Sequence, residues 1–194
     1  TGKMCTTIVS SRGCPYQCIF CLWPRTMYGM KFRARSPQNV VDEVEHVVNE
    51  YGIDEIYFDD DCLTLNKRRL MRICEEIRKR GIDVKWMCQC RVDNVDQELL
   101  GEMKRAGCHY IKYGVESGSQ EMLNAMKKGI TLEEARKAFE LSRKVGIKTQ
   151  AFFLLGLPWE TYETIRKTIN FAKELKPDSA QFAVVVPHPG TELY

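Results

Sequence analysis

The feature that most constrains the fold is a unit of helix, glycine and short apolar strand that recurs along the chain. Its glycines are Gly52, Gly81, Gly107 and Gly146. Each follows a helical pattern where the backbone commonly turns left-handed, a conformation that glycine adopts without a steric penalty. Basic side chains precede three of the four glycines, where they complement the negative end of a helix. Strands that alternate with helices of this length predict parallel strand–helix units.

Six apolar segments have the length and composition of strands, and helices are predicted between them. The strands are predicted at residues 4–9, 55–58, 84–88, 109–115, 148–155 and 180–186. Helix starts are marked by Ser36 before Pro37, by Asn66, by Asp96 and by a capping box from Thr131 to Glu134. About six such units are two fewer than a closed eight-fold barrel contains. We therefore predict an α/β fold: a partial (βα)6 TIM-like barrel with strands inside, helices outside and a lateral opening.

Helical spacing and cysteine chemistry predict part of the core. On the first helix the apolar face runs from Val40 to Tyr51. Six cysteines are interpreted as small core residues, and they are Cys5, Cys62, Cys74, Cys88, Cys90 and Cys108. Cys88 and Cys90 are expected to point to opposite faces of their strand, which argues against a joint site.

The composition narrows the class of protein. The 194 residues, 44% hydrophobic and 28% charged, are typical of a soluble globular domain, and we expect one domain over residues 1–194, excised from a longer chain. A net charge of +3 gives no evidence for nucleic acid binding. No apolar run approaches the ~18 residues that a transmembrane helix needs, and we expect no signal peptide. Nine cysteines, an odd number, do not suggest a secreted disulfide framework, so a cytoplasmic location is predicted.

A polar or irregular cluster follows each predicted strand. In chain order these clusters are residues 10–21, 59–61, Arg91, 116–119, 156–160 and 187–190. In parallel barrels the chemistry takes place at the carboxyl ends of the strands. One rule of the fold therefore predicts that all six clusters lie on the same face.

The first of these clusters contains Cys14, Cys18 and Cys21, in the spacing C-x3-C-x2-C. Thiolates are the usual ligands of iron–sulfur clusters, and three of them leave one iron of a [4Fe–4S] cluster open. A structural zinc site would need a fourth protein ligand, which is absent nearby, and a catalytic zinc site would take three ligands and water. We favour the cluster and keep a zinc site or unlinked thiols as the alternative.

The stretch from Arg12 to Cys21 resembles the cluster loop of the radical S-adenosylmethionine (radical SAM) superfamily. The pattern of that family is C-x3-C-x-aromatic-C, and Phe20 fills the aromatic position. The resemblance covers nearly the whole chain, because the family core is also a partial barrel of six units. It implies a [4Fe–4S] cluster on the three cysteines, S-adenosylmethionine (SAM) chelated to the open iron, and reductive cleavage of SAM to a 5′-deoxyadenosyl radical. It also implies an electron donor such as a flavodoxin or a ferredoxin.

The resemblance further implies SAM contacts at the strand ends. Asp60 and Asp61 stand where the family carries a Gly-Gly-Glu-like motif that binds the methionine amino group, and Asp61 aligns with the glutamate of that motif. A solvated acidic turn or a divalent cation site is the alternative. Arg91 could pair with the SAM carboxylate, and a surface salt bridge is the alternative. Glu116 and Ser117 are implied to contact the ribose hydroxyls, and helix capping by Ser117 or Ser119 is the alternative. Gly156 is implied to lie near adenine, and its position is also compatible with a tight turn.

Several stretches are most similar to the cobalamin-associated subgroup, whose members methylate unactivated carbons or close rings. They are residues 56–61, 114–119, 155–161 and 187–193. The subgroup holds its cobalamin in a separate N-terminal domain, so cobalamin is implied only for a longer parent protein. Methylthiotransferases are the nearest alternative within the superfamily. A non-catalytic zinc-binding module and a barrel that binds SAM without cleaving it are further alternatives, and the substrate is not identified.

Overall fold

Six parallel strands form the central sheet, and their order in space follows their order along the chain. The computed structural model describes residues 4–194. The strands are β1 (Cys5–Ile8), β4 (Glu55–Phe58), β5 (Lys85–Cys90), β6 (Cys108–Glu116), β7 (Lys148–Leu155) and β8 (Ser179–Val184). All neighbouring pairs are parallel, and β1 and β8 are the two edges of the sheet. The prediction of a partial barrel with six parallel strands is confirmed.

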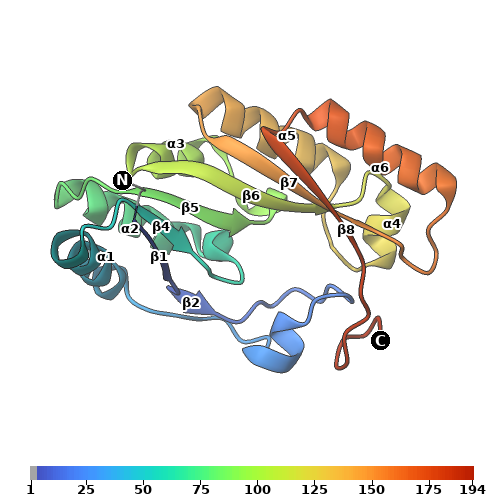
Figure 1. Cartoon of the computed structure of the whole chain (residues 1–194), viewed down its shortest axis with the longest axis horizontal. Helices are drawn as coiled ribbons and strands as arrows, with labels where there is room; N and C mark the ends of the chain where they lie inside the picture. Colours follow the sequence, from blue (N-terminus) through green and yellow to red (C-terminus); the bar gives the residue numbers. More distant parts are fainter. Residues whose placement is uncertain (1–3) are drawn as a thin grey trace.

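Helices connect the strands and cover the outer face of the curved sheet (Figure 1). They are α1 (Pro37–Tyr51), α2 (Lys67–Lys79), α3 (Gln97–Arg105), α4 (Gln120–Ala125), α5 (Leu132–Val145) and α6 (Tyr162–Leu175). The predicted starts are confirmed: the side chains of Ser36, Asn66 and Asp96 accept backbone N–H groups, and Thr131 and Glu134 form the capping box. All four predicted glycines have positive φ angles. Among the described residues, no helix is long and apolar enough to cross a membrane.

Five short elements were not predicted, because each is too short to show a periodic pattern. A two-stranded ribbon joins β2 (Ser11–Arg12) to β3 (Arg33–Ala34) in antiparallel pairing. The π-helix η1 (Trp23–Met27) lies between these two strands, and η2 (Leu63–Leu65) and η3 (Val92–Asn94) are 3-10 turns after β4 and β5. The ribbon closes the cysteine-containing segment into a loop beside the barrel.

The core agrees with the predicted pattern except at three points. Tyr51 is 61% exposed, because it is the last residue of α1 and lies beyond the buried face of that helix. Cys5 is exposed at the start of the edge strand β1, whereas the other five cysteines outside the loop are buried as predicted. Cys88 and Cys90 lie on one face of β5, with their sulfurs 3.5 Å apart, because residues two apart in a strand share a face.

Two glycines give a matched test of the packing against α6. A Cβ atom on Gly118 would lie 2.6 Å from the carbonyl oxygen of Lys167 and from the Cβ of Phe171, so Gly118→Ala is expected to destabilise the fold by about 1–3 kcal/mol. Gly101, within α3, would meet only the flexible end of Arg105, and Gly101→Ala is expected to stabilise by about 0.5–1 kcal/mol. Urea unfolding measures both changes. Equal midpoints for the two variants would contradict the packing described here.

Candidate functional site

The cysteine loop runs along the carboxyl ends of the strands and is attached to the barrel by backbone hydrogen bonds. Ile19, between two of the cysteines, is 4% exposed. Its N–H donates to the carbonyl of Met126 at 3.1 Å, and its carbonyl accepts from the N–H of Leu193 at 3.0 Å. The loop is therefore fixed by contacts from distant parts of the chain.

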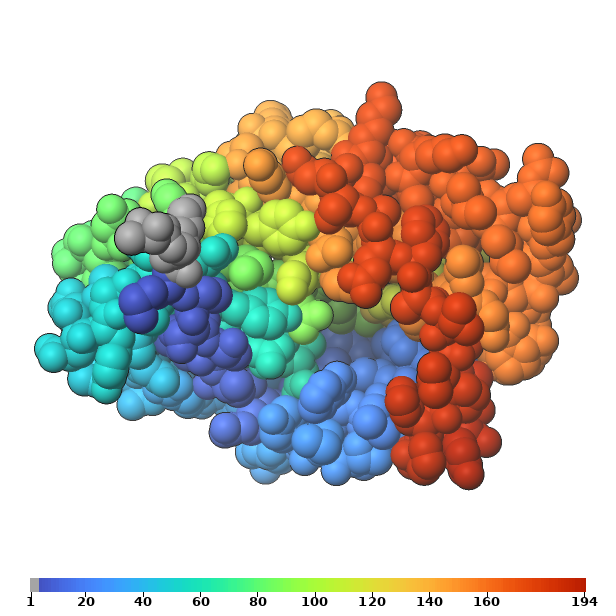
Figure 2. Space-filling model, in the orientation of Figure 1, coloured from blue at the N-terminus to red at the C-terminus, as the bar shows by residue number. Residues whose placement is uncertain are grey.

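One cavity of about 280 Å³ brings most of the predicted site residues together. Figure 2 shows a recess between the blue segment that carries η1 and the red C-terminal residues. Predicted residues that line the cavity are Cys14, Cys18, Phe20, Cys21, Asp60, Asp61, Arg91 and Glu116. The other lining residues include Tyr16, Asp59, Gln89, Cys90, Lys112, Gly114 and Lys128. The predicted residues Ser117 and Gly156 do not line this cavity.

The three cysteines supply the chemistry that an iron–sulfur cluster requires. All three are free thiols at one cavity, and cysteine thiolates are the usual ligands of iron–sulfur clusters. Within residues 4–194 no three His, Cys, Asp or Glu side chains converge closely enough to hold a single ion. A cluster with several irons does not need convergent ligands, because each cysteine binds a separate iron. Burial raises the pKa values of Cys14 and Cys21 to about 11, so ligation must release their protons.

Asp60 and Asp61 hold the cysteine loop. Asp60 is 1% exposed; its Oδ1 accepts from the Ser10 N–H at 2.7 Å, and its Oδ2 accepts from the hydroxyls of Ser10, at 2.6 Å, and Ser11. Asp61 accepts from the Gly13 N–H at 2.7 Å through Oδ2. Asp59, by contrast, is exposed to the cavity. A SAM contact from Asp60 stays a prediction, and in this structure both of its oxygens are engaged.

The anchoring role of Asp60 can be tested against its neighbour. Asp60→Ala leaves three donors of Ser10 and Ser11 without their acceptor, and the buried Arg69 without a nearby opposite charge, so a loss of at least about 2 kcal/mol in unfolding free energy is expected. Asp59→Ala, at the exposed position, is expected to change stability by less than about 0.5 kcal/mol. Chemical denaturation of the metal-free variants measures the difference, and a stable Asp60→Ala protein would contradict this assignment.

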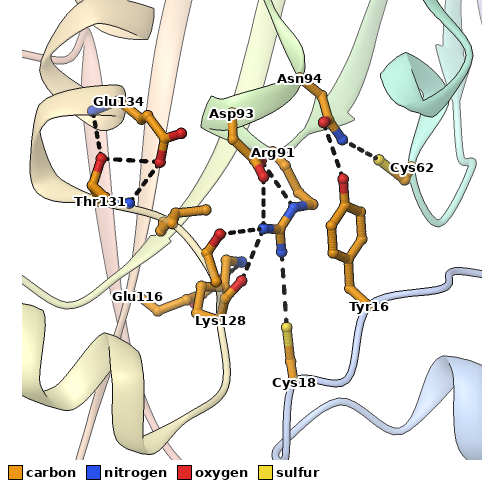
Figure 3. A network of polar contacts seen from close by, with 12 residues as sticks. Tyr16, Cys18, Cys62, Arg91, Asp93, Asn94, Glu116, Lys128, Thr131 and Glu134 are labelled. Carbon is orange, nitrogen blue, oxygen red and sulfur yellow. Dashed lines mark hydrogen bonds and ion pairs between the residues drawn. The ribbon is translucent and has the colours of Figure 1, made fainter.

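Arg91 is buried, and its guanidinium group already donates hydrogen bonds within the chain (Figure 3). Nε and Nη2 donate to the two carboxylate oxygens of Asp93, both at 2.9 Å, and Nη2 also donates to the carbonyl of Lys128 at 2.8 Å. A bidentate pairing with the SAM carboxylate stays a prediction, and it would require the hydrogen bonds from Arg91 to Asp93 to break.

Glu116 forms a buried ion pair with Lys128, in which Nζ lies 2.6 Å from Oε1. Glu116 has φ +68°, uncommon for a residue other than glycine, at a bulge where β6 shifts register against β7. The pair needs Gly114, because a Cβ there would lie 2.6 Å from Glu116 Oε1 and 2.9 Å from Lys128 Nζ. Burial lowers the pKa of Lys128, but the negative charge of Glu116 beside it outweighs this effect and raises the pKa overall.

Ser117 and Gly156 occupy structural positions. The Ser117 hydroxyl is fully buried, lies 3.1 Å from the Thr168 hydroxyl of α6, and accepts from the Ser119 N–H at the start of α4. Gly156 has φ +86° and donates its N–H to Glu160 in the turn after β7. Their predicted SAM contacts stay predictions. The turn interpretation describes the contact of Gly156, whereas the Ser119 side chain makes no capping hydrogen bond at the start of α4.

Sequence reasoning missed Lys128 and Tyr16. Lys128 belongs to the connection between α4 and α5, where lysines are common and no periodic pattern marks one that points inward. Tyr16 was read only as part of the cysteine motif, although its ring packs under the guanidinium of Arg91. Nothing in the local sequence around Lys128 or Tyr16 indicates that its side chain lies at the cavity.

A parallel partial barrel with a cysteine triplet at the strand ends defines the class of protein, and comparisons with known proteins agree with it. The family model described as the Radical SAM superfamily matches residues 8–172. The chain belongs to this superfamily, whose members use a [4Fe–4S] cluster and SAM, and the cysteine site described above fits that cluster.

Individual relatives cover nearly the whole chain. It is 38% identical to an uncharacterized methyltransferase of Pyrococcus horikoshii, over 96% of this chain and 40% of that protein. It is 37% identical to an anaerobic magnesium-protoporphyrin IX monomethyl ester cyclase of Cereibacter sphaeroides, over 95% of this chain and 30% of that protein. The structure of TsrM, a radical SAM methyltransferase from Kitasatospora setae solved with cobalamin and a [4Fe–4S] cluster bound, matches 99% of this chain and 38% of TsrM, with a TM-score of 0.90 and 26% identity. The chain thus spans 30–40% of the length of these relatives.

Proposed function

We propose that the chain is the catalytic core of a radical SAM enzyme that activates a C–H bond for methyl transfer or ring formation. One observation carries this proposal: the three cysteines share a cavity with carboxylates from the ends of β4 and β6. A purely structural metal site would have no use for a cavity of about 280 Å³ lined by charged side chains. We take residues 1–194 as one domain of a longer cytoplasmic protein.

The cysteines hold the cofactor, and the rest of the chain shapes the space around it. Cys14, Cys18 and Cys21 would bind the [4Fe–4S] cluster, and Phe20, which lies between Cys18 and Cys21 in the sequence, lines the same cavity. A cluster held there would supply the electron for reductive cleavage of SAM to a 5′-deoxyadenosyl radical, and the protein would contribute binding, orientation and charge.

Carboxylates at the cavity suit the polar groups of SAM. Asp59 is exposed to the cavity, and Asp61 keeps Oδ1 free of hydrogen bonds to the described residues, so both can accept from the methionine ammonium. Among the described residues Lys128 alone bonds to the Glu116 carboxylate, at Oε1, so Oε2 can accept from the ribose hydroxyls. Gly156 stays our candidate for close approach of the backbone to adenine, and Ser117 for a second ribose contact.

Similarity to the relatives supports cobalamin as a second cofactor of the complete protein. TsrM was solved with cobalamin, and it shares this fold at 26% identity. The similarity to a methyltransferase and to a cyclase supports either outcome for the substrate. A flavodoxin or a ferredoxin would supply the electron.

The proposal is tested by anaerobic reconstitution of the intact protein. About four irons and four acid-labile sulfides per chain are expected. With a strong reductant and SAM, the protein should then form 5′-deoxyadenosine or transfer the methyl group of SAM to a test acceptor. Zinc without sulfide would instead establish a non-catalytic module.

Two further outcomes separate the alternatives within the family. Tight SAM binding without any cleavage or methyl transfer would identify a barrel that has lost the reaction. Products that gain a methylthio group would place the protein among the methylthiotransferases. Mass spectrometry distinguishes a methylthio group from a methyl group by the mass of the added sulfur atom.

A further inference from the structure

Arg91 contacts the cysteine loop from inside the barrel with the parts of its guanidinium that Asp93 does not use. Nε and Nη2 donate to the Asp93 carboxylate, and Nη2 also donates to the carbonyl of Lys128. The remaining nitrogen, Nη1, and the flat face of the group are turned toward the loop (Figure 3). Arg91 is 7% exposed, so these contacts form away from bulk water.

The flat face holds Tyr16. The Cζ atom of Arg91 lies 3.6 Å from the centre of the Tyr16 ring, within the range of a strong cation–π contact. On its other side the Tyr16 hydroxyl donates to Asn94 Oδ1 at 3.0 Å. Arg91 directly precedes the single turn η3 and Asn94 is its last residue, so one short segment after β5 fixes Tyr16 at both its ring and its hydroxyl. Tyr16 lies midway between Cys14 and Cys18, and fixing it restricts the path of the loop between these ligands.

The free nitrogen faces a ligand sulfur. Nη1 of Arg91 lies 4.0 Å from Sγ of Cys18, and Cys18 is itself 7% exposed. Charge and hydrogen bonds at the sulfurs are among the factors that set the potential of an iron–sulfur cluster. A positive charge at this sulfur favours the reduced, more negative state of a cluster bound there.

We infer that Arg91 is a positioning residue of the cysteine loop, which holds the loop through Tyr16 and raises the reduction potential of the cluster through its charge at Cys18. The part that concerns potential rests on the proposed function. The part that concerns the loop does not, because it involves only contacts within the chain. In this inference Asp93 is the counter-charge that orients Arg91 and limits its effect.

The first experiment uses the intact protein without metal. Hydrogen exchange of the amides from Tyr16 to Cys21 is compared in wild type, Arg91→Met and Arg105→Met, where Arg105 is an exposed arginine of α3 that pairs with Glu102. Exchange about tenfold faster in Arg91→Met alone is expected from the lost contact to Tyr16. Unchanged exchange, or equal acceleration in Arg105→Met, would overturn the inference. This result stands even if the wild type binds no iron, in which case the proposed function fails separately.

The second experiment measures the midpoint potential of the reconstituted cluster by a redox titration followed with electron paramagnetic resonance. We expect Arg91→Met to lower the ratio of reduced to oxidised cluster about tenfold at a fixed potential, equal to about 59 mV for one electron. Arg91→Lys keeps a charge and should lose less, whereas Asp93→Asn removes the counter-charge and should shift the potential upward. A purely structural role predicts no such opposite shifts. Equal potentials in all variants, shifts of one sign, or a loss of SAM affinity in Arg91→Lys at unchanged potential would each overturn the inference.

Discussion

Replacement of Cys14, Cys18 or Cys21 by serine is expected to abolish SAM cleavage. Each of these thiols lies at the cavity, and serine offers a hard hydroxyl in place of a soft thiolate. A cluster left with two cysteine ligands is exposed to loss of iron, so the iron content should fall well below four per chain. Activity is expected to drop by at least about 10³-fold, because the chemical step belongs to the cofactor.

The chain offers matched controls for this prediction. Cys5→Ser changes an exposed cysteine on the edge strand β1, and it should retain full iron content and activity. Cys74→Ala changes a buried cysteine on α2; it should lower stability without affecting iron. Full activity in any of the three loop variants, measured as product per reconstituted cluster, would contradict the assignment of the ligands.

The second large effect is expected at Lys128. Lys128→Met leaves the Glu116 carboxylate buried without its partner, and breaking a buried pair in this way costs about 3–5 kcal/mol. The carboxylate should then take up a proton or turn toward water, and in either state it loses the fixed ionised form that we propose for ribose binding. SAM affinity, measured by equilibrium dialysis, should therefore fall together with stability.

A double variant separates the two effects. Lys128→Met with Glu116→Gln removes both charges, so most of the lost stability should return while SAM affinity stays low. The control is Lys127→Met, at the neighbouring position, which breaks an exposed pair with Glu192 and should cost less than about 1 kcal/mol. Recovery of SAM affinity in the double variant would show that Glu116 does not contact SAM.

The fold could be predicted because its signals are local and repeated. The bounds of β4 and β7 follow directly from apolar runs, and the same unit recurs often enough to define a parallel barrel. The strand-end rule then placed Cys14, Asp61, Arg91 and Glu116 at one cavity before any contact was known. What the rule supplies is a location, and it does not supply the partners of each side chain.

The partners could not be predicted because they depend on contacts between distant segments. Asp60 and Arg91 carry the charges that SAM binding would require, and only their surroundings show that Ser10 and Asp93 already engage them. The inward direction of Lys128 follows from a bulge in β6 and the absence of a side chain at Gly114. Such geometry is set by tertiary packing, which has no periodic trace in the sequence.

The hydrogen bond from Leu193 to Ile19 has a consequence for how the protein is made. Ile19 lies within the cysteine loop, yet one of its backbone partners is synthesised 174 residues later. At a ribosomal rate of 5–20 residues per second, the cysteines wait roughly 10–30 s before the loop can be completed. The closely spaced thiols of Cys14, Cys18 and Cys21 are accessible to oxidants and to other metal ions during that interval. Delivery of iron and sulfide is therefore expected only after Leu193 has been synthesised and has joined the barrel.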